Sequence, residues 1–125
     1  MLVGIGNDLL EVARMRRELA RAGGGFRDDV FTVAEIAYCE ARRHPARHFA
    51  ARFAAKEAFL KALGTGVGSW PVWREIEVVN GPHGEPGLVL SGGARRLAGR
   101  RKVRRALLSM SHTGTMAMAS VVLEA

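Results

Sequence analysis

Two carboxylates are the side chains of this sequence best suited to holding a metal ion. Asp8 follows a short strand-like segment near the N-terminus, and Glu57 lies within an alanine-rich helical stretch in the middle of the chain. A helix that packs on the strand could bring the two carboxylates together. Mg²⁺ prefers oxygen ligands and keeps several waters, so two carboxylates completed by substrate phosphates form an ordinary site. We therefore predict that Asp8 and Glu57 share a magnesium ion.

Cationic side chains near Glu57 could bind the phosphates of such a substrate. Arg52, Lys56 and Lys61 belong to the same helical stretch, and His112 follows a later strand. An unpaired buried ion is costly, so these charges need one another, another segment, or a charged ligand as partners. We expect contacts to a di- or triphosphate-like group, with Glu57, Lys61 and His112 as the catalytic residues. The alternative is a core helix with an ordinary Glu57–Lys61 ion pair at its rim.

The stretch that carries these charges has helical spacing and almost no polar face. Its phenylalanines and leucines form a broad apolar arc and alanines cover most of the remainder, which predicts a largely buried helix. We expect it to end at Gly64-Thr65-Gly66, because glycine just past a helix commonly supplies a left-handed C-cap. Gly64 and Gly66 could also let an anion approach closely, so both are candidate cofactor contacts.

The N-terminal residues predict a strand followed by a basic helix. Leu2-Val3-Gly4-Ile5 has strand character, and Gly6-Asn7-Asp8 is expected to break it, which places Asp8 at the strand end. Helical spacing then runs from residue 11 to residue 22. Three arginines share one face of this helix: Arg14, Arg17 and Arg21. That face is either solvated or docks an acidic partner.

The rest of the chain alternates helices with short strands. Thr32 and Glu35 form a capping-box signature for a helix to about Arg43, so Glu35 has a structural role that competes with one as general base. The remaining predicted elements are a hairpin of strands at 75–79 and 88–90, a helix at 91–102, and a hairpin at 106–111 and 116–123. This order indicates an α+β fold, with an antiparallel sheet and helices packed largely on one side.

Length and composition restrict the class of protein. The 125 residues, 48% of them hydrophobic, are enough for one domain spanning 1–125. No apolar run approaches the roughly 20 residues of a spanning helix and no signal peptide is apparent, so we expect a cytoplasmic protein with no membrane contact. Cys39 is the only cysteine, which excludes an internal disulfide and predicts a packed, inert thiol.

The net charge of +7, from 19 Lys+Arg against 12 Asp+Glu, favours an anionic partner. The aromatic fraction of 6% provides no evident stacking platform, so we do not expect nucleic acid. The alternative is a small basic nucleic-acid-binding module, with the arginine face of residues 14–21 and the segment 95–105 as its footprint. That alternative leaves Asp8 and Glu57 unexplained.

Two long segments carry a family resemblance. Gly4-Ile5-Gly6-Asn7-Asp8-Leu9-Leu10-Glu11-Val12-Ala13-Arg14 and Arg52-Phe53-Ala54-Ala55-Lys56-Glu57-Ala58-Phe59-Leu60-Lys61-Ala62-Leu63-Gly64-Thr65-Gly66 resemble the paired signatures of the holo-acyl-carrier-protein synthases, which are 4′-phosphopantetheinyl transferases. Ser109-Met110-Ser111-His112-Thr113 matches as well. The resemblance spans nearly the whole chain. Asn7 departs from the threonine or apolar residue usual at its position.

The resemblance implies transfer of phosphopantetheine from coenzyme A to a serine of an acyl carrier protein, as in fatty acid biosynthesis. It implies that Asp8 and Glu57 hold Mg²⁺ and that Lys61 and His112 contact phosphates, with Arg52 and Lys56 as weaker correspondences. Similar short synthases form trimers with a site at each subunit interface, so the resemblance also implies a homotrimer. We expect the face of Arg14, Arg17 and Arg21 to bind the carrier protein, whose helices are acidic. A non-catalytic subunit that binds coenzyme A or a carrier protein is a second alternative, and it needs no metal pair.

Overall fold

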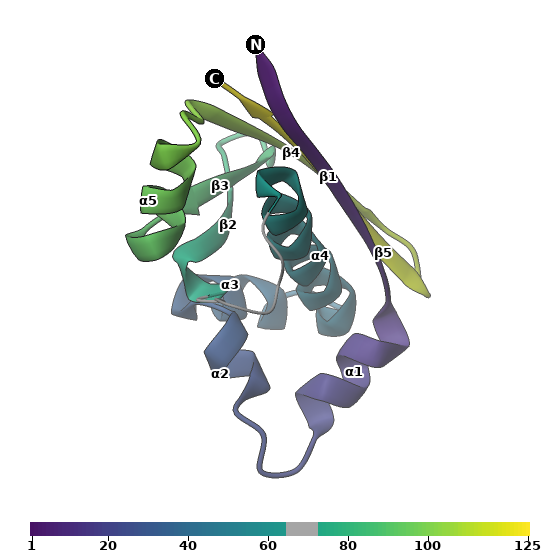
Figure 1. Ribbon diagram of the computed structural model, residues 1–125. Helices are drawn as coiled ribbons and strands as arrows, with labels where there is room; N and C mark the ends of the chain where they lie inside the picture. Colours follow the sequence, from purple (N-terminus) through teal and green to yellow (C-terminus); the bar gives the residue numbers. More distant parts are fainter. Residues whose placement is uncertain (65–72) are drawn as a thin grey trace.

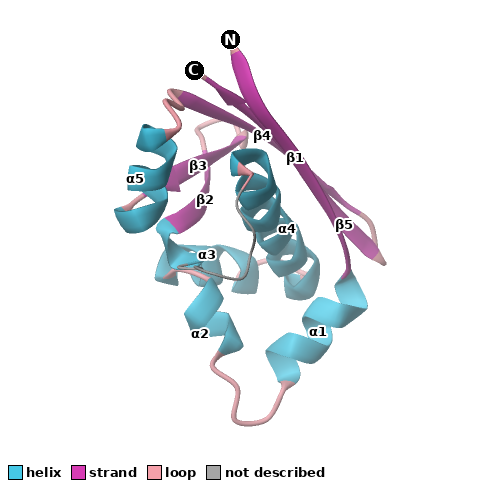
Figure 2. Ribbon diagram, viewed as in Figure 1, coloured by secondary structure: helices cyan, strands magenta, loops and turns pink. Residues whose placement is uncertain are grey.

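The computed structural model describes residues 1–64 and 73–125 of the chain. Figures 1 and 2 show their helices and strands. In chain order the elements are β1 (Leu2–Glu11), α1 (Val12–Ala20), α2 (Phe26–Val30), α3 (Val33–Glu40), α4 (Pro45–Leu63), the short 3₁₀ helix η1 (Trp73–Glu75), β2 (Ile76–Asn80), β3 (Pro86–Leu90), α5 (Gly92–Arg100), β4 (Arg105–His112) and β5 (Met116–Glu124). The prediction that involves Gly66 lies outside the described residues.

The fold is α+β, as predicted, with antiparallel strands and helices on one side of the main sheet. The sheet has the strand order β1-β5-β4, and β2 pairs with β3 in a separate hairpin. The helix α4 lies against one face of the three-stranded sheet, between it and the β2–β3 hairpin (Figure 1). The opposite face of the sheet leaves large apolar side chains exposed: Ile5, Leu9, Leu107 and Met118.

The contact between α4 and β1 depends on small residues. A Cβ on Gly6 would lie 2.2 Å from the carbonyl oxygen of Ala58, and one on Gly4 would lie 2.2 Å from that of Ala62. Only glycine lets the strand backbone approach the helix this closely. The predicted strand break at Gly6-Asn7-Asp8 is therefore wrong, because these glycines serve helix packing. Asp8 lies within a ten-residue strand, opposite Ala119 of β5.

Most other predicted elements are confirmed. The capping box of Thr32 and Glu35 is present at the start of α3, and α4 ends at Gly64, whose φ of 77° is the left-handed C-cap conformation. Both hairpins and α5 lie within a few residues of the predicted bounds. The sequence interpretation missed α2, a five-residue helix after the glycine run, because so short an element has too little periodicity to detect.

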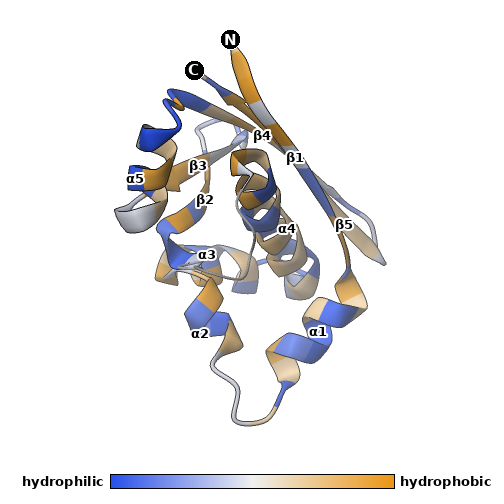
Figure 3. Ribbon diagram, in the orientation of Figure 1, coloured by the Kyte–Doolittle hydropathy of each residue, from blue (hydrophilic) through white to orange (hydrophobic). Residues whose placement is uncertain are grey.

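Buried apolar residues surround α4 on both sides, and α1 and α5 carry many of the polar positions in Figure 3. Cys39 is fully buried on α3, and burial raises the pKa of its thiol to about 12, in agreement with the predicted inert thiol. Among the described residues, none of the helices combines the length and the apolar character that crossing a membrane requires.

Candidate active site

Asp8 and Lys61 join the middle of β1 to the C-terminal half of α4. Side chains alternate along a strand, so Asp8 points to the same side as Gly6, toward the helix. The Nζ of Lys61 donates to Oδ1 of Asp8 across 2.9 Å and to the carbonyl oxygen of Asn7 across 3.1 Å. The Asp8 side chain is 16% exposed and that of Lys61 is 51% exposed, so both groups can be reached from solvent.

Glu57 lies one helical turn before Lys61, and the charge of Asp8 affects its pKa. Partial burial raises the pKa of Glu57 first, the nearby Asp8 carboxylate raises it further, and Lys61 and Arg14 oppose the change. The packing of α4 on β1 has thus brought two carboxylates from distant parts of the chain into one electrostatic neighbourhood. In this geometry Lys61 pairs with Asp8 and not with Glu57.

The donor set at this point fits a magnesium ion in part. The described residues contain no cluster of three or more His, Cys, Asp and Glu side chains that could hold a metal. The Asp8 carboxylate disfavours the ionised form of Glu57 and so raises its pKa, and a cation shared by the two side chains would offset this cost. Substrate phosphates and water would have to supply the other oxygen ligands, as is usual for Mg²⁺.

Lys56 lies on the other side of α4 in a fully buried ion pair. Its Nζ donates to Oε1 of Glu35 across 2.7 Å, and to the carbonyl oxygens of Trp73 and Ile76 across 3.0 and 2.8 Å. Both charged side chains are 0% exposed. The three protons of the ammonium are thereby used within the protein. The charge of Lys56 is thus paired with a residue of another segment, which was one of the alternatives left open by the sequence. None of its ammonium protons remains to bind a phosphate.

Both carboxylate oxygens of Glu35 also have hydrogen-bond partners within the protein. Its Oε1 accepts from the backbone N–H of Thr32, in the capping box, and from Lys56, while its Oε2 accepts from the backbone N–H of Val78. The side chain thus ties α3, α4 and β2 together. These contacts favour the structural role of Glu35 over a role as general base.

Arg52 also faces inward and is 3% exposed. Its Nη2 donates to Oδ1 of Asn80 across 2.6 Å, and its guanidinium lies 3.9 Å from the ring centroid of Tyr38. The Nε atom is buried and has no hydrogen-bond partner among the described residues. The assignment of Arg52 to a phosphate stays a prediction.

His112 belongs to a second cationic group, at the N-terminal half of α4. It ends β4 and is exposed, and its ring centroid lies 4.8 Å from that of His48. At a rise of 1.5 Å per residue, His48 lies about 13 Å along α4 from Glu57 and about 20 Å from Lys61. Within one chain, His112 therefore lies beside the start of α4, whereas Glu57 and Lys61 lie in the C-terminal half of this helix.

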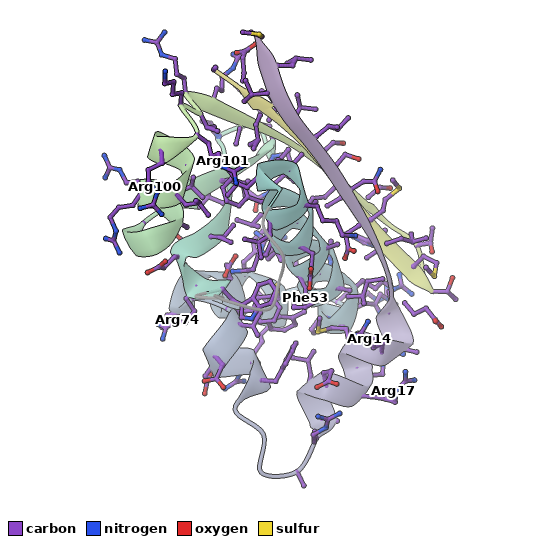
Figure 4. The ribbon with its side chains drawn as sticks, viewed as in Figure 1. Arg14, Arg17, Phe53, Arg74, Arg100 and Arg101 are labelled. Carbon is purple, nitrogen blue, oxygen red and sulfur yellow. The ribbon has the colours of Figure 1, made fainter. Side chains whose placement is uncertain are left out.

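A small pocket opens between α1, α2 and α4. It has a volume of about 130 Å³ and its lining residues are Leu10, Arg14, Met15, Glu18, Phe26 and Phe53. Figure 4 shows Arg14 and Arg17 along α1, with Phe53 across from them on α4. Arg21, just past the helix end, pairs with Glu18 across 2.9 Å. The apolar walls and basic rim of this pocket were missed from the sequence, although Phe53 precedes Glu57 by one helical turn.

Comparisons with known proteins show the family to which the chain belongs. The model of the 4′-phosphopantetheinyl transferase superfamily matches residues 4–117. The chain is 50% identical over 123 residues to holo-[acyl-carrier-protein] synthase from Syntrophotalea carbinolica, covering 98% of this chain and 96% of the relative. A crystal structure of the synthase from Neisseria meningitidis superposes with a TM-score of 0.89 at 32% identity over 100% of both chains.

The holo-(acyl-carrier-protein) synthase from Bacillus anthracis, solved in complex with CoA (3′,5′-ADP), superposes with a TM-score of 0.82 at 35% identity. That match covers 100% of this chain and 98% of the other. The chain described here belongs to the 4′-phosphopantetheinyl transferase superfamily. Within it, the chain is similar over its full length to holo-[acyl-carrier-protein] synthases.

Proposed function

We propose that this protein transfers 4′-phosphopantetheine from coenzyme A to a serine hydroxyl of an apo-acyl-carrier protein. The observation that carries the proposal is the convergence of Asp8, Glu57 and Lys61 on one edge of α4, in a chain of this superfamily. The serine oxygen forms a bond to the β-phosphorus of coenzyme A. The bond from that phosphorus to the bridging oxygen breaks, and adenosine 3′,5′-bisphosphate leaves with the electron pair.

Lys61 is the residue best placed to stabilise this reaction. Its ammonium is half exposed and so can exchange part of its contact with Asp8 for an oxygen of the pyrophosphate. Asp8 and Glu57 would hold Mg²⁺, which supplies charge stabilisation on the pyrophosphate. The serine proton goes to a base or to water, and the geometry of Glu35 makes it a poor candidate for that base.

We further propose that the complete site forms between subunits of a homotrimer. His112 contacts His48 at the start of α4, whereas Glu57 and Lys61 lie in the C-terminal half of this helix. A neighbouring subunit could bring its own His112 group to the Asp8 group. The exposed apolar face of the sheet, where Ile5 is 75% and Leu9 65% exposed, offers a surface for such assembly.

The carrier protein would dock on α1. Arg14, Arg17 and Arg21 are exposed on this helix and at its C-terminal end, and a pocket lined by Phe53 opens beside it. Basic side chains would steer an acidic carrier helix, while the pocket could accept one of its apolar side chains near the reacting serine. We also propose a single cytoplasmic domain over residues 1–125, organised around α4.

The experiment that tests this function measures adenosine 3′,5′-bisphosphate released from coenzyme A by chromatography. Release should require the apo-carrier protein, its serine and Mg²⁺ together. A protein that only binds coenzyme A or a carrier would release none. A nucleic-acid-binding module would likewise release none, and would instead retard labelled RNA or DNA with a steep dependence on salt.

A further inference from the structure

His48 is an imidazole enclosed by aromatic and cationic groups from three elements. It lies in the first turn of α4 and is half-buried. Its ring packs edge-on against Tyr38 of α3, with centroids 6.0 Å apart, and against His112 of β4, with centroids 4.8 Å apart and ring planes at 70°. The His48 ring therefore lies between Tyr38 of α3 and His112, the exposed imidazole that we assign to a phosphate.

The charged groups that face His48 are all basic. Arg42 comes from the end of α3, where it stacks over Tyr38 at 4.0 Å, Arg47 and Arg52 come from α4, and His112 comes from β4. Burial, then His112 and these arginines, lowers the pKa of His48. Its ring is thus neutral near pH 7 while no anion is bound.

The arginines around His48 lack anionic partners within the described parts of the chain. No described carboxylate forms an ion pair with Arg42, Arg47 or Arg52. The Nε atom of Arg47 is buried without a hydrogen-bond partner among the described residues. Its Nη2 reaches the turn after β4, where it would lie 3.4 Å from a Cβ on Gly114. Arg47 and His112 thus approach the same turn, and the guanidinium of Arg47 has no anionic partner among the described residues.

We propose that His48 is a further nucleotide-binding residue, which takes up a proton when a phosphate of the nucleotide docks against His112 and Arg47. The inference rests on the proposed function, which supplies the phosphate. A phosphate at this place adds negative charge next to a ring that is otherwise surrounded by positive charge. The anion thereby favours the imidazolium form of His48, which was disfavoured before binding.

Proton uptake has a measurable consequence for affinity. If one proton enters with the ligand, the dissociation constant falls by up to about tenfold for each unit by which the pH decreases. The affinity for adenosine 3′,5′-bisphosphate should therefore increase from about pH 8 to about pH 6, across the ordinary range of a histidine. If His48 only filled space, the dependence of the affinity on pH would come from the ligand and from other groups, and replacing His48 would not change it.

The test is isothermal titration calorimetry of the full-length protein with adenosine 3′,5′-bisphosphate, in two buffers of different ionisation enthalpy. The number of protons taken up is compared between the wild type and two variants. His48→Phe keeps an aromatic ring against Tyr38 and His112, whereas His48→Gln keeps polarity and loses the ring. The ligand's own phosphates titrate equally in all three proteins, so the difference between proteins reports on residue 48.

We expect both variants to lose about half or more of the proton uptake near pH 7 and to show a flatter dependence of affinity on pH. Unchanged proton uptake in both variants would overturn the inference. Weaker binding by His48→Gln alone, with wild-type uptake in both variants, would reduce His48 to a packing residue and also overturn it. A wild-type protein that binds no adenosine 3′,5′-bisphosphate would contradict the proposed function itself, which separates the two failures.

Discussion

The Nζ of Lys61 lies 2.9 Å from Oδ1 of Asp8, so an ion pair connects the middle of β1 to α4 at the proposed reaction site. Because half of the Lys61 side chain is exposed, this pair adds little to stability. Lys61→Met keeps much of the apolar stem and removes the charge. We predict nearly unchanged thermal unfolding and a loss of turnover of roughly 10²-fold or more, the effect of deleting one preorganised charge-stabilising donor. A large decrease in Tm with retained turnover would identify Lys61 as a structural residue.

Asp8 and Glu57 should both be required for magnesium-dependent transfer. Asp8→Ala and Glu57→Ala each remove one of two carboxylates, which leaves a shared Mg²⁺ under-coordinated. We predict a loss of turnover of at least about 10²-fold in each, and a higher Mg²⁺ concentration for half-maximal activity. The measurement is a Mg²⁺ titration of the transfer rate. Normal rates with Asp8→Ala at ordinary Mg²⁺ concentration would exclude the shared site.

The buried pair of Lys56 and Glu35 should matter for stability. Lys56→Met leaves the carboxylate of Glu35 buried without its cation, a change that typically costs about 3–5 kcal/mol. Urea unfolding followed by circular dichroism measures this loss. The double variant Lys56→Met with Glu35→Gln removes both charges and should recover part of it. A Lys56→Met protein as stable as the wild type would show that the buried pair is dispensable.

Carrier recognition is best tested at Arg17, because Arg14 also acts on the pKa of Glu57. Arg17 is exposed on α1 (Figure 4). Arg17→Glu replaces attraction by repulsion toward an acidic carrier helix, so the KM for the carrier should increase by about tenfold while the KM for coenzyme A stays nearly constant. The control is Arg95→Glu, an equal charge change on exposed α5. Equal effects of both variants would argue for net charge and against a docking face.

The packing of β1 on α4 predicts that Gly6 tolerates no side chain. In Gly6→Ala the new Cβ would meet the carbonyl oxygen of Ala58 at 2.2 Å, so the strand must move away from the helix. We expect a loss of at least about 1–3 kcal/mol, typical of overpacked cores, together with lower turnover because Asp8 moves with the strand. Chemical denaturation measures the first effect. Gly99→Ala is the control, because nothing lies within 4 Å of a Cβ there.

Local patterns predicted the helices and hairpins because they depend on spacing and capping. The buried character of α4 and the cap at Thr32 are examples. The strand break at Gly6 was wrong because a glycine that ends a strand and a glycine that admits a helix are identical in sequence. The sequence likewise could not show which carboxylate pairs with Lys56. It is Glu35, 21 positions away, and only the packing of α3 on α4 brings it there.

The contacts of His112 could not be predicted from the sequence either, because they depend on how distant segments pack together. His48 and His112 belong to a helix and a strand that are far apart in the chain, and no periodicity relates them. The distances along α4 then separate two groups that the sequence analysis had assigned to one site. This arrangement is the reason why we propose that a neighbouring subunit completes the site.

The central claim is the transfer of phosphopantetheine, and intact-protein mass spectrometry of the carrier tests it most directly. The purified protein is incubated with coenzyme A, Mg²⁺ and an apo-acyl-carrier protein, beside a carrier whose acceptor serine is replaced by alanine. We predict that the wild-type carrier gains the mass of one phosphopantetheine and that the alanine carrier gains none. An unmodified wild-type carrier, under conditions in which a known synthase modifies it completely, would contradict the account.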